Sequence, residues 1–354
     1  MRLVTGFAIA KFVRFVTRLR GGGSALPGFV LLRFVPEVLR KSLGQLSQGV
    51  IFVTGSNGKS TTTAMLVSIF RAQGLRVFTN PAGGNLPQGL ASALVGEASL
   101  RGVVAADIAV LEVDEAYGPQ IAQRVTPGWV LVTNLQLDQL NRFGDPEAVY
   151  QMLHTLCQEA TKGVVVNGGD PNTRALGGQL HQEGARVLHM EVSAIAQAAA
   201  AHGLVAAPLF FESPAQLPNA PIVVVNSVEG AQVSMTAEDT EVAVSLPSVG
   251  LHYAVDAALA LTMALVVLPD LSLEKAVTAL EQATPVYGRG EIIRYRGRDV
   301  SLTMMKNLPS LQANLDAFVS MAPDSDSPLH AIVNYEQMMR IRRIAGYKEL
   351  EGTR

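Results

Sequence analysis

The sequence is poor in cysteine, in charged residues and in long apolar runs. One cysteine, Cys157, among 354 residues excludes an internal disulfide framework and a multi-cysteine zinc site, so we expect no zinc. A lone cysteine also fits a reducing compartment, and we expect a cytoplasmic protein. Charged residues make up 16% of the chain and hydrophobic residues 48%, which predicts compact folding. The net charge of −2 does not indicate a nucleic-acid-binding protein.

No apolar run reaches the length of a membrane span. The first residues, MRLVTGFAIAKFVRFVTRLR, are interrupted by basic residues too early for a signal core or a span. Lys11, Arg14 and Arg18 fall on one face of a helix. That helix either rests on the inner, anionic membrane surface as a peripheral contact, or packs on its own domain with a solvated basic side. The stretch Ala257–Leu268 is also too short to span and predicts a buried helix.

Strand-like and helix-like segments alternate from residue 49 onward, which predicts an α/β fold with a parallel sheet and helices on its faces. Residues 205–248 alternate in polarity and turn, which indicates antiparallel strands at one edge of the sheet. The expected strands are Ile51–Thr54, Arg76–Thr79, Ile108–Val113, Trp129–Thr133 and Gly163–Asn167, with helices at Ser60–Gln73 and Pro146–Ala160.

A new unit begins after Pro285. We therefore expect three parts, namely basic lead helices over residues 1–48, a central domain over 49–284 and a C-terminal domain over 285–354. The elements expected in the last part are strands at Glu291–Arg294, Val300–Met304 and Ala331–Asn334 and a helix at Leu308–Ser320.

The stretch VTGSNGKSTTT, residues 53–63, predicts a phosphate-binding turn between a strand and a helix. Backbone amides in such a turn point at phosphate oxygens, and the helix N-terminus adds partial positive charge. Lys59 can reach the outer phosphates of ATP, and Ser60 can offer its hydroxyl to Mg²⁺. Val53 stands where the strict Walker pattern has its first glycine. The predicted ATP-binding residues of the turn are Gly55, Ser56, Asn57, Gly58, Lys59, Ser60 and Thr61.

Two further segments follow predicted strands at the edge where open α/β sheets bind ligands. One is LEVDE, residues 111–115, in which Glu112 or Asp114 can complete a magnesium shell with Ser60. The other is TNLQLDQLNRFGD, residues 133–145.

These three segments, together with NGGDP at 167–171, resemble the Mur ligase family in order and spacing. The resemblance implies amide-bond formation through an acyl phosphate made with ATP. More narrowly, the chain resembles the MurT subgroup, the ligase-like subunits of lipid II isoglutaminyl synthase. That resemblance rests on GGGSALPG at 21–28, on Gln139 in place of a usual histidine, on YGRGE at 287–291 and on MKN at 305–307.

The resemblance implies a Mur-ligase-like central P-loop domain and a smaller, apparently incomplete, Rossmann-like C-terminal domain. It implies that Ser60 and Glu112 bind Mg²⁺ and that Asn80 and Asn85 face the acceptor substrate. The further residues that it implies around the transferred phosphate are Asn134, Gln139, Arg289, Lys306 and Asn307.

The chain also departs from the subgroup. The zinc ribbon of these proteins cannot form with Cys157 alone, and we expect His181, His189 and His202 to be surface residues. The family's adenine-binding stretch is altered to GLHYAVD at 250–256, in which Asp256 can accept from the adenine amino group and Tyr253 can stack.

The function that the resemblance implies is ATP-dependent amidation of the stem-peptide D-glutamate of lipid II, with ammonia from a GatD-like glutaminase partner. Cys157 lies in a helical stretch and is expected to be a core residue rather than a nucleophile. Two alternatives stay open: an amino-acid-adding ligase of the Mur or folylpolyglutamate type, and a non-catalytic nucleotide-binding subunit. Gln139 and the short C-terminal part count against the first alternative. The short C-terminal part and the altered adenine stretch favour the second somewhat.

Overall fold

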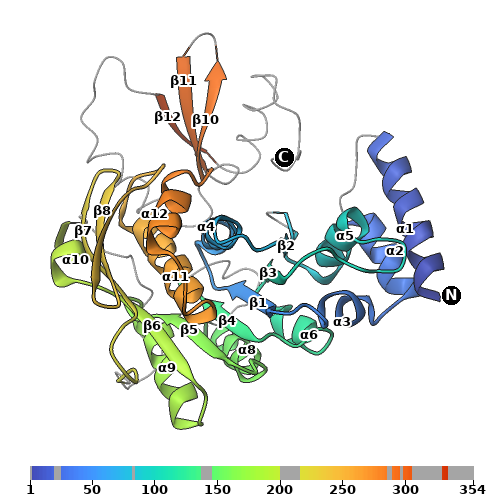
Figure 1. Ribbon diagram of the computed structural model, residues 1–354, viewed down its shortest axis with the longest axis horizontal. Helices are drawn as coiled ribbons and strands as arrows, with labels where there is room; N and C mark the ends of the chain where they lie inside the picture. Colours follow the sequence, from blue (N-terminus) through green and yellow to red (C-terminus); the bar gives the residue numbers. More distant parts are fainter. Residues whose placement is uncertain are drawn as a thin grey trace.

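Figure 1 shows a large twisted sheet between layers of helices, a group of helices at the N-terminal end and a separate small sheet. The structure is a computed structural model of the chain. It describes residues 2–19, 25–81, 84–136, 146–199, 216–284, 289–295, 298–304 and 329–333.

The large sheet has the strand order β2-β3-β1-β4-β5-β6-β7-β8-β9. Neighbours from β2 to β7 are parallel, and β7, β8 and β9 pair antiparallel. The parallel sheet and its antiparallel edge are therefore confirmed. The strands are β1 (Gly49–Thr54), β2 (Val77–Thr79), β3 (Ile108–Glu112), β4 (Trp129–Val132), β5 (Gly163–Asn167), β6 (Val187–Val192), β7 (Val223–Glu229), β8 (Gln232–Ala237) and β9 (Thr240–Ser245).

Both faces of the parallel part are covered, which is why inner strands such as β1, β4 and β5 are nearly continuous apolar runs. In β1, Ile51 and Val53 face a cluster that includes α4, α11 and α12, whereas Val50 and Phe52 face a cluster that includes α2, α5, α6, α8 and α9. The helices are α4 (Lys59–Ala72), α5 (Pro87–Glu97), α6 (Gly118–Ala122), α8 (Pro146–Gln158), α9 (Pro171–Gln182), α10 (Ala194–Ala199), α11 (Leu251–Val267) and α12 (Leu273–Glu281).

Three helices precede the sheet: α1 (Arg2–Leu19), α2 (Leu26–Phe34) and α3 (Val38–Leu43). The contact of α2 with α5 is close because Gly28 has no side chain. Its N–H donates to Ser92 Oγ at 2.8 Å, and a Cβ there would lie 1.9 Å from Gln88 O. Within the described residues, no helix is both long enough and apolar enough to cross a membrane.

The second sheet has the order β10-β11-β12. Strand β10 (Arg289–Tyr295) pairs antiparallel with β11 (Arg298–Met304), which pairs parallel with β12 (Leu329–Val333). The three strands expected after residue 285 are thus present. The expected helix Leu308–Ser320 lies outside the described residues, and a Rossmann-like arrangement stays a prediction.

Cysteine and histidine positions test two further expectations. Cys157 is buried in α8, as expected, and its burial raises the pKa of the thiol. His181 is exposed, but the expectation of a surface position is wrong for His189. His189 lies in β6 with 3% of its surface exposed, since β6 is an inner strand that sequence spacing does not predict. His202 lies outside the described residues.

Candidate functional site

The turn between β1 and α4 is built on two glycines. Gly55 and Gly58 have φ of +120° and +81°, which L side chains rarely adopt. A Cβ on Gly55 would lie 2.3 Å from Thr133 Oγ1, and one on Gly58 would lie 2.2 Å from Asp256 Oδ1. The turn therefore closes tightly against its neighbours and presents backbone amides at the N-terminus of α4.

Lys59, the first residue of α4, is buried in this turn with 4% of its surface exposed. Its Nζ donates to Glu115 Oε1 at 2.7 Å and to Ser56 O at 3.2 Å, and it also contacts Gly55 O. Sequence reasoning singled out Lys59 but missed Glu115, because the choice among three acids in LEVDE depends on how the chain turns after β3.

The acidic segment follows β3 beside the turn. Glu112 ends β3 opposite Val53 of β1, and both it and Asp114 are buried. The side chain of Asn80 accepts from the Glu112 N–H at 2.9 Å and donates to the Glu112 carbonyl at 3.0 Å. Asn85 accepts the Asp114 N–H through its carbonyl at 3.1 Å. Both asparagines thus shape the acidic segment, and their contact with substrate stays a prediction.

Residues 133–136, which follow β4, fasten the turn from the other side. Asn134 donates to the Asn57 carbonyl at 3.1 Å and accepts the Asn57 N–H at 2.9 Å. Thr133 Oγ1 donates to the same carbonyl at 2.6 Å, and the Gln136 N–H donates to Ser56 Oγ at 3.0 Å. These contacts fix the turn before any ligand arrives, and they give Asn134 a supporting role that the sequence does not reveal.

The NGGDP segment, residues 167–171, lies at the end of β5 and holds residues 133–136 in place. Asn167 donates to the Thr133 carbonyl at 2.9 Å. The Asp170 carboxylate accepts the N–H groups of Asn172 and Thr173 and so caps α9. Burial raises the pKa of Asp170 to about 6, although the amides around it favour the charged form.

Two residues of α11 were expected near the adenine of a nucleotide. Asp256 is buried beside Gly58 and accepts from Thr62 Oγ1 at 3.2 Å. Tyr253 is buried in the apolar cluster below, and burial raises the pKa of its hydroxyl. The Tyr253 ring is packed against other protein side chains with 4% of the residue exposed, so the structure does not support its stacking on a nucleotide base.

Four further predicted residues cannot be located with respect to the turn. Gln139, Lys306 and Asn307 lie outside the described residues. Arg289 is the first residue of β10, but its side chain also lies outside the described part. Their roles stay predictions.

The oxygen donors beside the turn fit the chemistry of Mg²⁺, which is bound through one or two carboxylates together with substrate phosphates. Ser60 and Glu112 are buried at the ends of neighbouring elements, and they supply a hydroxyl and a carboxylate. Among the described residues, no group of three or more His, Cys, Asp or Glu side chains could hold a metal ion by itself.

The chain is similar to known proteins in the region that contains this site. The family described as Mur ligase middle domain matches residues 53–264. The MurT subunit of lipid II isoglutaminyl synthase (glutamine-hydrolyzing) from Streptococcus pneumoniae is 35% identical over 172 residues, which are 48% of this chain and 38% of that protein. The match therefore spans well under two thirds of that relative.

Solved structures have the same fold. MurF from Acinetobacter baumannii has a TM-score of 0.64 at 19% identity and covers 83% of this chain and 58% of its own. MurF ligase from Thermotoga maritima in complex with ADP has a TM-score of 0.61 at 17% identity and covers 84% and 62%. Because the family match includes the turn, the acidic segment and the two supporting segments, and extends over more than half of the sequence, this chain belongs to the Mur ligase family.

Proposed function

We propose that the protein is an ATP-dependent carbon–nitrogen ligase that amidates the α-carboxylate of the stem-peptide D-glutamate in lipid II. The observation that carries the proposal is the buried Lys59 in a turn fixed from both sides. The name of the Streptococcus pneumoniae relative supports the choice of this reaction within the family.

The site offers a chemical role for each group around the turn. The amides of residues 55–60 and the Lys59 ammonium suit the phosphates of ATP. Lys59 already contacts a carboxylate and carbonyl oxygens, so a phosphate oxygen is a similar partner for it. Ser60 and Glu112 would hold Mg²⁺, which offsets negative charge on the phosphates.

The reaction has two steps. An acceptor carboxylate oxygen attacks the γ-phosphorus of ATP, and the bond between that phosphorus and the bridging β-phosphate oxygen breaks. The products are ADP and an acyl phosphate. Ammonia then attacks the carbonyl carbon, phosphate leaves, and the nitrogen loses one proton to give the amide. Positive charge at Lys59 offsets the charge that develops on the transferred group. We propose that the transferred phosphoryl group is also contacted by Gln139, Arg289, Lys306 and Asn307. The acceptor substrate would be bound by Asn80 and Asn85.

The ammonia comes from a second protein in this proposal. Cys157 is buried in α8, where a thiolate is disfavoured, and so it does not suit the attack on glutamine. We propose a GatD-like glutaminase as the partner. Lipid II as acceptor places the reaction at the cytoplasmic face of the membrane, where the protein would be peripheral.

Acceptor-dependent turnover tests the proposal. The chain would be incubated with MgATP and lipid II, together with ammonia, glutamine or a panel of amino acids, and both phosphate release and the mass of the product would be measured. We expect amidated lipid II with ammonia and none with glutamine unless a GatD-like glutaminase is added. Incorporation of a whole amino acid would instead identify an amino-acid ligase, and ATP binding without turnover would identify a non-catalytic subunit.

A further inference from the structure

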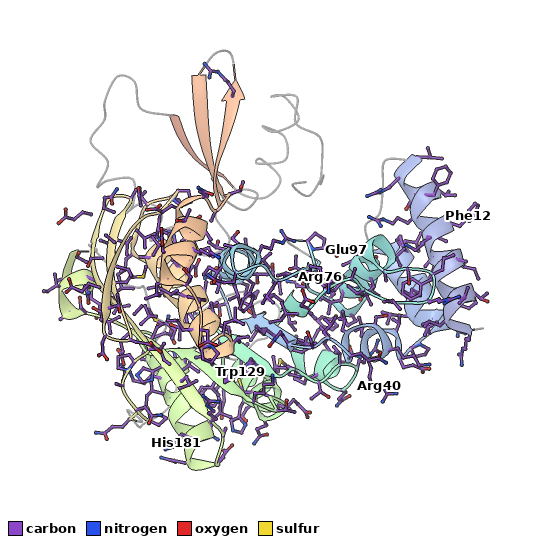
Figure 2. The ribbon with its side chains drawn as sticks, viewed as in Figure 1. Phe12, Arg40, Arg76, Glu97, Trp129 and His181 are labelled. Carbon is purple, nitrogen blue, oxygen red and sulfur yellow. The ribbon has the colours of Figure 1, made fainter. Side chains whose placement is uncertain are left out.

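The N-terminal helix α1 has an apolar stripe on its outer face. Val4, Ala8, Phe12, Phe15 and Leu19 recur at intervals of four or three residues, and all five are exposed. Phe12, Phe15 and Leu19 have 67%, 61% and 72% of their surface exposed. Figure 2 shows Phe12 on the outer side of α1, at the edge of the molecule.

The opposite face of the same helix explains how it is held. Gly6, Phe7 and Ala10 are buried, and Gly6 lies against Val35 and neighbouring residues of the second helix. Lys11 donates to the Val95 carbonyl at 3.0 Å, near the C-terminus of α5, where a cation is favourable. The apolar stripe is therefore not needed for docking α1 onto the domain.

The neighbouring helix α2 adds to the exposed apolar surface. Leu26, Phe29 and Phe34 are exposed, so seven of the eleven large exposed hydrophobic residues in the described part belong to α1 and α2. Single exposed apolar residues are ordinary, but a concentration of this kind marks an interaction surface.

The charge of this region indicates the partner. Residues 1–36 contain six Lys or Arg and no Asp or Glu, whereas the remaining chain has 22 basic and 30 acidic residues. Arg18 and Arg33 are exposed on the two helices that carry the aromatic residues. Aromatic and aliphatic side chains bordered by cations match the interface of a bilayer with anionic lipids.

We propose that α1 and α2 bind the surface of an anionic phospholipid bilayer, with Phe12, Phe15 and Leu19 entering the headgroup–acyl boundary and Arg18 and Arg33 on lipid phosphates. The inference deepens the proposed function by naming the surface that faces the membrane, but its geometry depends only on the N-terminal helices. It also narrows the sequence-based alternative of a helix resting on an anionic membrane surface, because only Arg18 of the three basic residues on one helix face is exposed. Lys11 and Arg14 are half-buried, and a Cβ on Gly96 of α5 would lie 2.5 Å from Arg14 Nη1.

Sedimentation with vesicles tests this proposal on the whole chain. We expect binding to vesicles of phosphatidylglycerol and cardiolipin, little binding to phosphatidylcholine, and a strong decrease in high salt. Phe12→Ser/Phe15→Ser should weaken binding at least about tenfold, since two exposed rings no longer enter the interface. Arg18→Gln/Arg33→Gln should weaken binding to the anionic vesicles alone.

Matched controls lie on the far side of the molecule from α1 (Figure 1). Ile195→Ser removes an equally exposed apolar side chain from α10, and Lys275→Gln removes an exposed charge from α12, and neither should change binding. Vesicle binding that is absent, or unaffected by the α1 and α2 variants, would overturn the proposal. A dimer that Phe12→Ser/Phe15→Ser dissociates without lipid would assign the stripe to a second copy instead.

This experiment is separate from the test of ligase activity. The vesicles contain no lipid II, and nucleotide turnover is not measured. A chain that binds vesicles but does not amidate lipid II would contradict the proposed function only, and the reverse result would contradict the membrane surface only.

Discussion

Lys59 is both a buried residue of the fold and the cation expected to meet phosphate. Its ammonium and the Glu115 carboxylate are each less than one tenth exposed, so neither charge is well solvated without the other. A phosphate ligand would therefore meet a lysine that is already paired with Glu115. Changing Lys59 alone removes both this ion pair, which affects stability, and the contact expected with phosphate, which affects MgATP binding.

A double-mutant cycle separates these contributions. Lys59→Met keeps the methylene packing but leaves Glu115 buried without its cation, so we expect a loss of about 3 kcal/mol of unfolding free energy. Lys59→Met/Glu115→Gln should recover most of that loss, because no charge is left unpaired, yet it should still not bind MgATP. Urea unfolding and nucleotide titration measure the two effects.

The surface pair Lys41–Glu37 provides the control for this cycle. Its side chains are 49% and 38% exposed, so Lys41→Met should leave the unfolding free energy close to that of the unchanged protein. A double variant as unstable as Lys59→Met, or normal MgATP affinity in either variant, would contradict the role given to the buried pair.

Asp170 gives the stability of the fold a pH dependence of known sign. Its pKa is about 6 in the folded protein, compared with an ordinary value of 3.8 that applies to the unfolded chain. Between pH 3.8 and pH 6 the folded protein therefore binds more protons than the unfolded chain. The contribution of Asp170 to stability is thus fully present below pH 3.8 and is lost as the pH rises through 6, with a slope of at most about 1.4 kcal/mol per pH unit.

Asp170→Asn isolates this contribution, because asparagine also caps a helix but does not titrate in this range. We expect the unfolding free energy of the unchanged protein, relative to Asp170→Asn, to fall between pH 4 and pH 7. Denaturant unfolding at several pH values measures the difference. A difference that is constant or that rises with pH would mean that Asp170 is not held in the environment described here.

At the scale of elements, the turn before α4 depends on glycine for two separate reasons. Gly58 has a left-handed backbone, and any Cβ on it would overlap the Asp256 carboxylate. Gly74, just after α4, shares the left-handed backbone with φ of +90°, but a Cβ there would have no atom within 4 Å. The two positions therefore distinguish backbone strain from steric overlap.

Gly74→Ala should cost only the strain of about 1 kcal/mol and should leave nucleotide binding intact. Gly58→Ala should cost more, because Asp256 must move, and it should weaken MgATP binding because the amides of the turn move with it. Thermal unfolding and nucleotide titration of both variants check this. Equal effects of the two substitutions would show that Asp256 does not restrict the turn.

The elements of the parallel sheet could be predicted where apolar runs and turn glycines coincide. Ile51–Thr54 and Gly163–Asn167 are continuous apolar runs that end in polar residues, and they lie within or match observed strands. Strand β6 could not be predicted in the same way, because His189 and Glu191 interrupt its apolar pattern. Glu191 is accommodated by a tertiary neighbour, since Arg174 of α9 pairs with it.

At the scale of the whole molecule, the sequence predicted which segments form the site but not how they support one another. The order of the segments places them after β1, β3, β4 and β5, which are inner strands of one sheet. The pairing of Lys59 with Glu115 and the fastening of Asn57 by Asn134 depend on side chains more than 50 positions apart. Contacts of that kind are set by strand order and loop geometry, which local spacing does not encode.

The concentration of basic residues in α1 and α2 also separates charge along the described part of the molecule, in which these two helices lie at one end (Figure 1). A negatively charged surface exerts a torque on such a separation of charge as well as a force on the net charge. Salt limits that torque to about 8 Å from the surface at physiological ionic strength. The protein would therefore tumble freely until its last few ångströms of approach, and there it would turn its N-terminal end toward the surface before any side chain touched lipid.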